Sequence, residues 1–89
     1  MQLSCLRYRD GSDERADWNT IQVYPEDACS ITVYHLRPGS LYHFTVLARS
    51  HQSDEELFSE VLNATTQGTT AAAVHQHLSL SDFSFGSVG

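Results

Sequence analysis

The sequence contains no lysine, and its five basic residues, all arginines, stand against eleven acidic residues, giving a formal net charge of −6. A nucleic-acid-binding domain needs a cationic face to displace counterions from phosphates, and an anionic membrane surface also attracts positive charge. The charge balance therefore argues against nucleic-acid binding and against membrane contact. No apolar run approaches the roughly 20 residues that cross a bilayer. The first ten residues also lack the apolar segment of a signal peptide.

Cysteine is scarce, with only Cys5 and Cys29 in the chain. Two cysteines allow one disulfide and do not make a disulfide-dense scaffold. By alternation Cys5 shares an outward face with Arg7, whereas Cys29 shares an inward face with Ile31 in a different sheet. Bonding geometry between such positions is unfavourable, so we predict two free thiols.

The 89 residues are 40% hydrophobic, which is enough for the modest core of one small domain. The dominant period of the apolar pattern is two, which is typical of strands. Turn signals separate the strands, among them Asp10-Gly11 and the pair Pro38-Gly39. No segment shows a convincing helical pattern, so the sequence predicts an all-β sandwich. The expected strands cover residues 3–9, 18–24, 28–34, 42–49 and 58–66.

The composition shifts near Gly68. Residues 69–89 are dominated by serine, glycine and other small residues, and no turn signal separates a strand pair there. We predict one domain over residues 1–67 and a flexible tail or linker over residues 68–89. The alternation of Leu78 and Leu80 leaves docking of this segment as the alternative.

The stretch from Leu36 to Ala48 resembles the fibronectin type III family, with a leucine, a Pro-Gly turn, a tyrosine and then alternating apolar residues. The resemblance covers about residues 3–67. Within the family, the sequence resembles modules from receptor-type tyrosine phosphatases and adhesion receptors. It implies an immunoglobulin-like sandwich in which residues 6–9 belong to strand C and residues 18–23 to strand C′. The structural residues that it points to are Leu36, Pro38, Gly39, Tyr42 and Trp18.

Tyr42 follows the turn closely enough for its hydroxyl to bond to the backbone just upstream, as in the tyrosine corner of such sandwiches. Leu36 is expected to close the end of the core. The family has seven strands, and this chain begins at the third, so strands A and B are absent. We therefore expect a sandwich that is incomplete at its N-terminus. Either the chain is part of a longer protein, or the 78–85 segment or a second copy replaces the missing strands.

Several residues are candidates for a site. Asn63-Ala64-Thr65 is an N-glycosylation sequon, and Asn63 points to solvent if Leu62 and Ala64 point inward. The histidines at 75 and 77 supply at most two metal ligands where zinc needs about four, so we favour exposed tail residues and predict no metal site. The acidic groups near residues 10–17 and 54–56 are interpreted as solvated loops. The expected partner face comprises Arg7, Arg9, Gln22, His43, Thr45 and Leu47.

No nucleophile motif and no glycine-rich phosphate loop occurs in the sequence, so we expect neither an enzyme nor a cofactor. The favoured function is a non-catalytic binding or spacer module of an extracellular cell-surface receptor or adhesion protein, acting through contact with a protein partner. The alternative is an intracellular structural module of a cytoskeletal or muscle-type protein, in which free cysteines are normal. Open strand edges would in addition permit self-association.

Overall fold

The computed structural model describes residues 2–13, 15–23, 29–49 and 55–85. Within these ranges the secondary structure is seven β-strands and one short 3-10 helix, η1, with no α-helix, which confirms the all-β prediction. The expected end of the second strand at residue 24, and Glu14 and Asp54 of the two acidic groups, lie outside the described residues. The elements are β1 (Gln2–Asp10), β2 (Asn19–Gln22), β3 (Ser30–Leu36), β4 (Leu41–Arg49), β5 (Glu56–Phe58), β6 (Leu62–Thr65), β7 (Val74–Ser79) and η1 (Leu80–Asp82).

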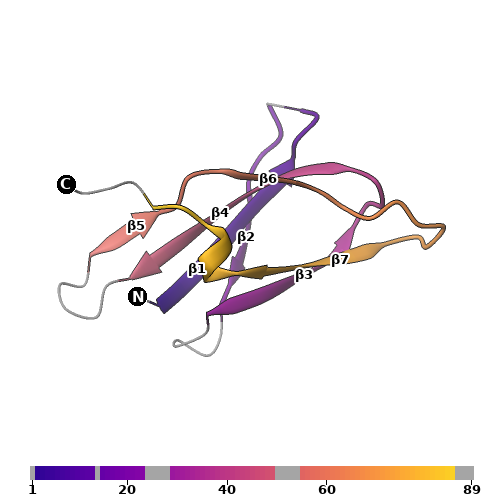
Figure 1. The fold of residues 1–89 in the computed structure, drawn as a ribbon. Coiled ribbons are helices and arrows are strands. Elements are labelled where there is room, and N and C mark those ends of the chain that lie inside the picture. The colour runs from indigo at the N-terminus through magenta and orange to yellow at the C-terminus, as the bar shows by residue number, and fades with distance from the viewer. Residues whose placement is uncertain (1, 14, 24–28, 50–54, 86–89) are drawn as a thin grey trace.

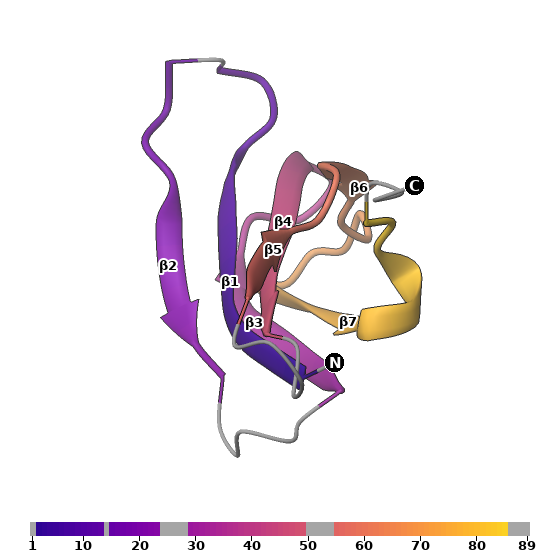
Figure 2. The same ribbon diagram turned by 90° about the vertical axis from the view of Figure 1, so that its left-hand side faces the viewer.

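The strands form two antiparallel sheets (Figure 1). In the large sheet β2 pairs with β1, β1 pairs with β4, and both β5 and β6 pair with the other side of β4. In the small sheet β3 pairs with β7. Figure 2 shows β2 and β7 on opposite sides of the molecule.

The period of two explains why β1 and β4 form the centre of the large sheet. Successive side chains of a strand point to opposite faces, so alternating apolar residues gather on one face. Leu6, Phe44 and Val46 are fully buried, as the alternation predicts. On the other face Arg7 and Arg9 of β1 lie opposite Thr45 and His43 of β4.

The last strand expected from the sequence is divided into β5 and β6, and Ser59 joins the two parts to β4. The backbone N–H of Val46 donates to the Ser59 hydroxyl oxygen over 2.9 Å, and the Ser59 N–H donates to the Val46 carbonyl over 2.9 Å. Ser59 is buried, so these bonds satisfy polar groups that water cannot reach. The interruption therefore keeps the β4 edge hydrogen-bonded although the ladder is broken.

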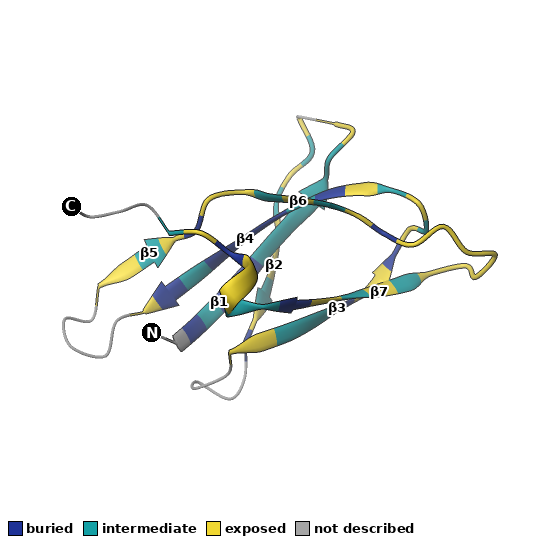
Figure 3. Ribbon diagram, viewed as in Figure 1, coloured by how far each residue is buried: buried dark blue, intermediate teal, exposed yellow. Residues whose placement is uncertain are grey.

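The segment beyond Gly68 is not a tail throughout, which corrects the sequence-based prediction for residues 74–85. Residues 74–79 form β7, which lies antiparallel to β3 with Ile31 opposite Leu78 and Thr32 opposite His77. Leu78 is 3% exposed and Phe83 is 7% exposed, so this segment buries apolar side chains that a mobile terminus would leave in water. Figure 3 shows the exposed connection that leads from β6 to β7.

The core lies between the two sheets, because both contribute to one cluster of buried side chains. The large sheet supplies Leu6, Phe44 and Val46, among others, and the small sheet supplies Val33, Leu36 and Leu78. In the described residues β3 and β7 together cover the inner face of the large sheet. Leu78 and Phe83 belong to the 78–85 segment, which the sequence analysis offered as one replacement for the missing strands.

Candidate binding face

The outer face of the large sheet brings together the residues that the sequence assigned to a partner face. Strand register sets Arg9 opposite His43 and Arg7 opposite Thr45. Cys5 lies between its two register partners, Gln22 of β2 and Leu47 of β4. Side chains that are directly opposite in register share a face. All six predicted positions therefore lie on the side of the sheet that points away from the core.

Arg9 is held between two rings at one end of this face. Its guanidinium carbon lies 4.5 Å from the centre of the Trp18 ring, and its Nε donates to Nδ1 of His43 over 3.4 Å. A guanidinium over an indole is attracted by the negative face of the ring. Trp18, predicted as a structural residue, lies just before β2 and outside the core cluster. Its ring contributes to the outer face, and the sequence pattern did not reveal this contact.

Arg7 forms a second pair of the same kind further along the face. Its guanidinium carbon lies 4.9 Å from the ring centre of Phe58, a residue of β5 that is 51% exposed. Arg7 Nε is buried, and the described residues offer it no hydrogen-bond partner. Phe58 was not among the predicted face residues, although its register position opposite Leu47 places it there. A large apolar residue at an outward position of a strand is the signal that could have identified it.

Thr45 does not offer a contact surface, which corrects its assignment to an accessible face. It is 8% exposed, and its hydroxyl donates to the backbone carbonyl of Ser59 over 2.9 Å. The residue therefore ties β4 to the interruption between β5 and β6. Leu47 is half-buried, and Gln22 is exposed.

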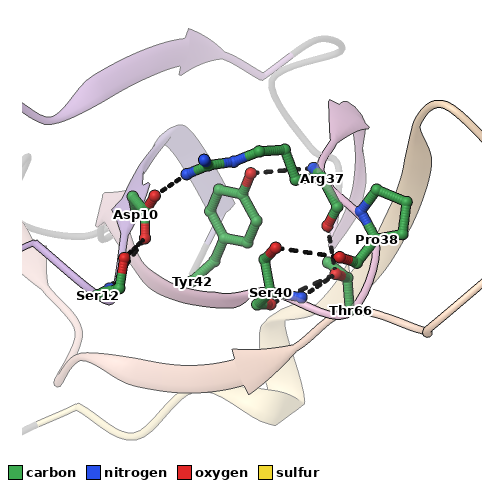
Figure 4. A network of polar contacts seen from close by, with 7 residues as sticks. All are labelled: Asp10, Ser12, Arg37, Pro38, Ser40, Tyr42 and Thr66. Carbon is green, nitrogen blue, oxygen red and sulfur yellow. Dashed lines mark hydrogen bonds and ion pairs between the residues drawn. The ribbon is translucent and has the colours of Figure 1, made fainter.

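A polar network surrounds the turn between β3 and β4 (Figure 4). The N–H of Arg37 donates to the Tyr42 hydroxyl oxygen over 3.0 Å, which is the upstream backbone bond that the sequence predicted. The Arg37 guanidinium forms an ion pair with Asp10, whose carboxylate also accepts from the Ser12 hydroxyl over 2.6 Å. The turn is thereby joined to the end of β1 by charge and to β4 by Tyr42.

The predicted turn residues have the conformations that their types require. Gly39 has φ +59°, a left-handed conformation that glycine adopts without steric cost. Its N–H donates to the Gln67 carbonyl over 3.0 Å. The Thr66 hydroxyl accepts from the Ser40 N–H over 3.0 Å. Leu36 is 1% exposed and belongs to the core, as expected for a residue that closes its end.

Asn63 of β6 is exposed, whereas Leu62 and Ala64 pack against the core. The alternation therefore gives Asn63 the outward orientation that a glycan needs. Asn63 lies opposite His43 in register, on the same face as Arg9. A glycan there would cover one end of the candidate face and leave the Arg7–Phe58 end accessible.

Both cysteines are free, in agreement with the prediction. Cys5 is buried within the large sheet, but Cys29 is exposed, so the expected inward orientation of Cys29 is wrong. Cys29 precedes β3, which begins at Ser30. Alternation within the strand therefore does not determine the direction of the Cys29 side chain.

The histidines at 75 and 77 lie on β7 rather than on a mobile tail. Both are exposed on the outer side of the small sheet, where the Thr32 hydroxyl and Nδ1 of His77 are 3.0 Å apart. The ring of His75 lies 5.9 Å from that of Tyr34. Over the described ranges no group of three or more potential metal ligands occurs.

No family model, curated protein or solved structure matches this chain. No helix in the described part of the chain is long and apolar enough to span a bilayer.

Proposed function

We propose that the chain is a non-catalytic binding and spacer module of the fibronectin type III kind, from the extracellular part of a cell-surface receptor or adhesion protein. The proposal assigns it no catalytic residue and no cofactor. The strand order supports the family assignment. The order β2–β1–β4, with both β5 and β6 beside β4, is the one expected for strands C′, C, F and an interrupted G, and β3 then takes the place of E. The Tyr42 hydroxyl, which accepts from the Arg37 N–H over 3.0 Å, supports the same assignment.

The small sheet departs from the family pattern. Strand B of the family precedes strand C in the sequence and pairs with E. Here β7, which follows all the other strands, occupies the position beside β3. A strand from the C-terminal side of the chain therefore takes the position of strand B beside β3, and Leu78 of this strand covers part of the core.

The observation that carries the binding function is the pair of guanidinium–ring contacts on the outer face of the large sheet. Arg9 over Trp18 and Arg7 over Phe58 present two cations held in place by aromatic rings on an otherwise acidic protein. Arginine and aromatic residues are enriched among the interface residues that carry most of the binding energy. An arginine that is already positioned by a ring loses less freedom on binding. The face therefore suits a protein partner with acidic groups.

The sequon at Asn63 favours the extracellular setting over the intracellular structural alternative. Its side chain is exposed beside the face, and N-linked glycans are added only in the secretory pathway. The free thiol of Cys29 favours the alternative, because exposed thiols persist in a reducing compartment. Glycan occupancy at Asn63 and the redox state of Cys29 in the native protein decide between the two.

Site-specific photo-crosslinking on the surface of living cells tests the binding proposal. A photoreactive residue is placed at Gln22, which is exposed on the candidate face, and a control residue at Tyr34, which is 62% exposed on the small sheet. We expect crosslinks to a discrete protein from position 22 alone, and we expect Arg7→Ala, at the end of the face that a glycan leaves accessible, to abolish them. Equal products from both positions, or products that survive Arg7→Ala, would overturn the assignment of this face.

A further inference from the structure

Strand β7 has a neighbour on one side only in the described part of the chain. Its pairing with β3 contains one register shift, between Val33 and Leu36, and the one extra residue there belongs to β3. A groove lined by Gln67, Ala73 and residues 74–77 lies beside the strand. An unpaired strand edge presents a row of N–H and C=O groups that can hydrogen-bond to another strand. Within the described residues no second strand pairs with that row.

The other edges are protected in the ways that natural sheets use. Strand β2 has only four residues. Strand β3 is irregular near His35, whose φ of 63° turns the backbone out of the extended conformation. The β5–β6 edge is interrupted, and the Glu60 N–H there donates to the Ser84 carbonyl over 2.7 Å. Strand β7 alone has six regular residues with no proline, no charge and no bulge.

Charge singles out the same edge. The sequence carries a net charge of −6, but the stretch from Val61 to Ser81 contains no aspartate, glutamate, lysine or arginine. Two copies of this chain repel each other wherever acidic surfaces meet, and β7 offers the approach on which this repulsion is smallest. The nearest carboxylate along the chain, Asp82, accepts a hydrogen bond from the Ser79 N–H over 2.8 Å.

The sequence of β7 is also self-complementary. Leu78 is buried and Val74 half-buried on the inner side, whereas His75 and His77 are exposed on the outer side. When two copies of β7 pair antiparallel about a two-fold axis at Gln76, Val74 of each copy faces Leu78 of the other, and His75 faces His77. Apolar residues then meet apolar residues, as strand register requires where one face is buried.

We propose that β7 is a strand-addition site whose occupant is β7 of a second copy of this chain. The two small sheets then form one four-stranded sheet in the order β3–β7–β7–β3, and the groove beside β7 is filled. The contact is isologous, so it closes as a dimer and does not propagate. One added strand pair is a small interface, so we expect a weak dimer with a dissociation constant in or above the micromolar range, on the order of 10–100 μM.

Sedimentation equilibrium of the full chain, at concentrations from a few to several hundred μM, tests the proposal. The double variant His75→Lys/His77→Lys places lysine opposite lysine across the proposed axis. Because like charges directly opposite destabilise a strand pair, it should raise the dissociation constant about tenfold. The control Thr20→Lys/Gln22→Lys adds the same charge at the same spacing to exposed positions of β2, on the opposite side of the molecule, and should change the constant by less than about twofold. A wild-type chain that stays monomeric, or equal weakening by both variants, would overturn the proposal.

A crosslinking experiment tests the register without depending on those variants. In a Cys29→Ser background, a His75→Cys chain and a His77→Cys chain are oxidised separately and as a mixture. Directly opposite residues have Cα atoms about 4.5–5.5 Å apart, which a disulfide can span. We expect the mixture to give a disulfide-linked dimer, because position 75 of one copy lies opposite position 77 of the other. Each variant alone should give little disulfide-linked dimer, because its cysteine lies opposite a histidine. A link that forms as readily in each variant alone would contradict the two-fold axis at Gln76.

Discussion

The two sheets of this molecule differ in how strongly their sequences encode them. The large sheet is built around β4, in which Tyr42, Phe44 and Val46 alternate with polar residues without a break. In β7 of the small sheet the inward positions are Val74, Gln76 and Leu78, and a glutamine interrupts the apolar series. A segment in which apolar residues alternate only weakly forms a strand when a partner strand and an uncovered apolar face are already present. The small sheet therefore depends on the large one more than the reverse.

The largest expected effect comes from removing the small sheet's second strand. A chain truncated after Gly68 loses β7, η1 and the buried residues Leu78 and Phe83. Domains of this size have only about 5–15 kcal/mol of stability, so we expect the truncated chain to lose its cooperative thermal melt. The intact chain is the control, followed by near-UV circular dichroism in parallel. A sharp melt from the truncated monomer would mean that β3 alone covers the large sheet.

The next effect concerns the turn that joins the two sheets. Tyr42→Ala removes a buried ring and should lower the free energy of unfolding by about 3–5 kcal/mol. Tyr42→Phe removes only the acceptor of the Arg37 N–H and should cost about 1 kcal/mol. Urea denaturation of both variants beside the wild type gives these values. Equal midpoints for all three proteins would refute the role of the Tyr42 hydroxyl in the turn.

A matched pair of core variants compares the sheets directly. Leu78 of β7 and Leu6 of β1 are both buried in one cluster, so Leu78→Ala and Leu6→Ala should each cost about 2–5 kcal/mol. His77→Ala, at an exposed position of β7, should change stability by no more than about 0.5 kcal/mol. Chemical denaturation measures all three. If Leu78→Ala were as mild as His77→Ala, β7 would contribute nothing to the core.

The smallest effect on stability is expected at Asn63. When the chain is expressed through a secretory pathway, its mass should increase by an N-linked glycan that Asn63→Gln removes. Because Asn63 is exposed and outside the core, the unglycosylated variant should keep its melting temperature. Intact-mass spectrometry and a thermal melt provide the two measurements. A secreted, folded chain without the glycan would favour the intracellular alternative.

Much of the candidate face could be predicted because it follows from alternation alone. Once Leu6 and Phe44 are assigned to the inside, Arg7, Arg9 and His43 must lie outside. The ring contacts could not be predicted, because they depend on strand register and not on alternation alone. Trp18 lies just before β2, which pairs with β1, and Phe58 of β5 reaches Arg7 of β1 across β4. The burial of Thr45 could not be predicted either, because the Ser59 carbonyl that accepts its hydrogen bond lies in the interruption between β5 and β6, which alternation does not reveal.

The sequence by itself determined the strands whose apolar residues alternate, the glycine in the left-handed turn and the hydroxyl of Tyr42 beside the upstream backbone. These are local features, and each depends on residues within a few positions of one another. Only the tertiary structure decided that residues 74–79 pair with β3. The free energy for that pairing comes from covering Leu6, Phe44 and Val46. These residues are distant in sequence from β7, so the amino-acid pattern of β7 does not indicate that it will cover them. A segment that reads as a tail in isolation is thus ordered by the apolar surface it covers.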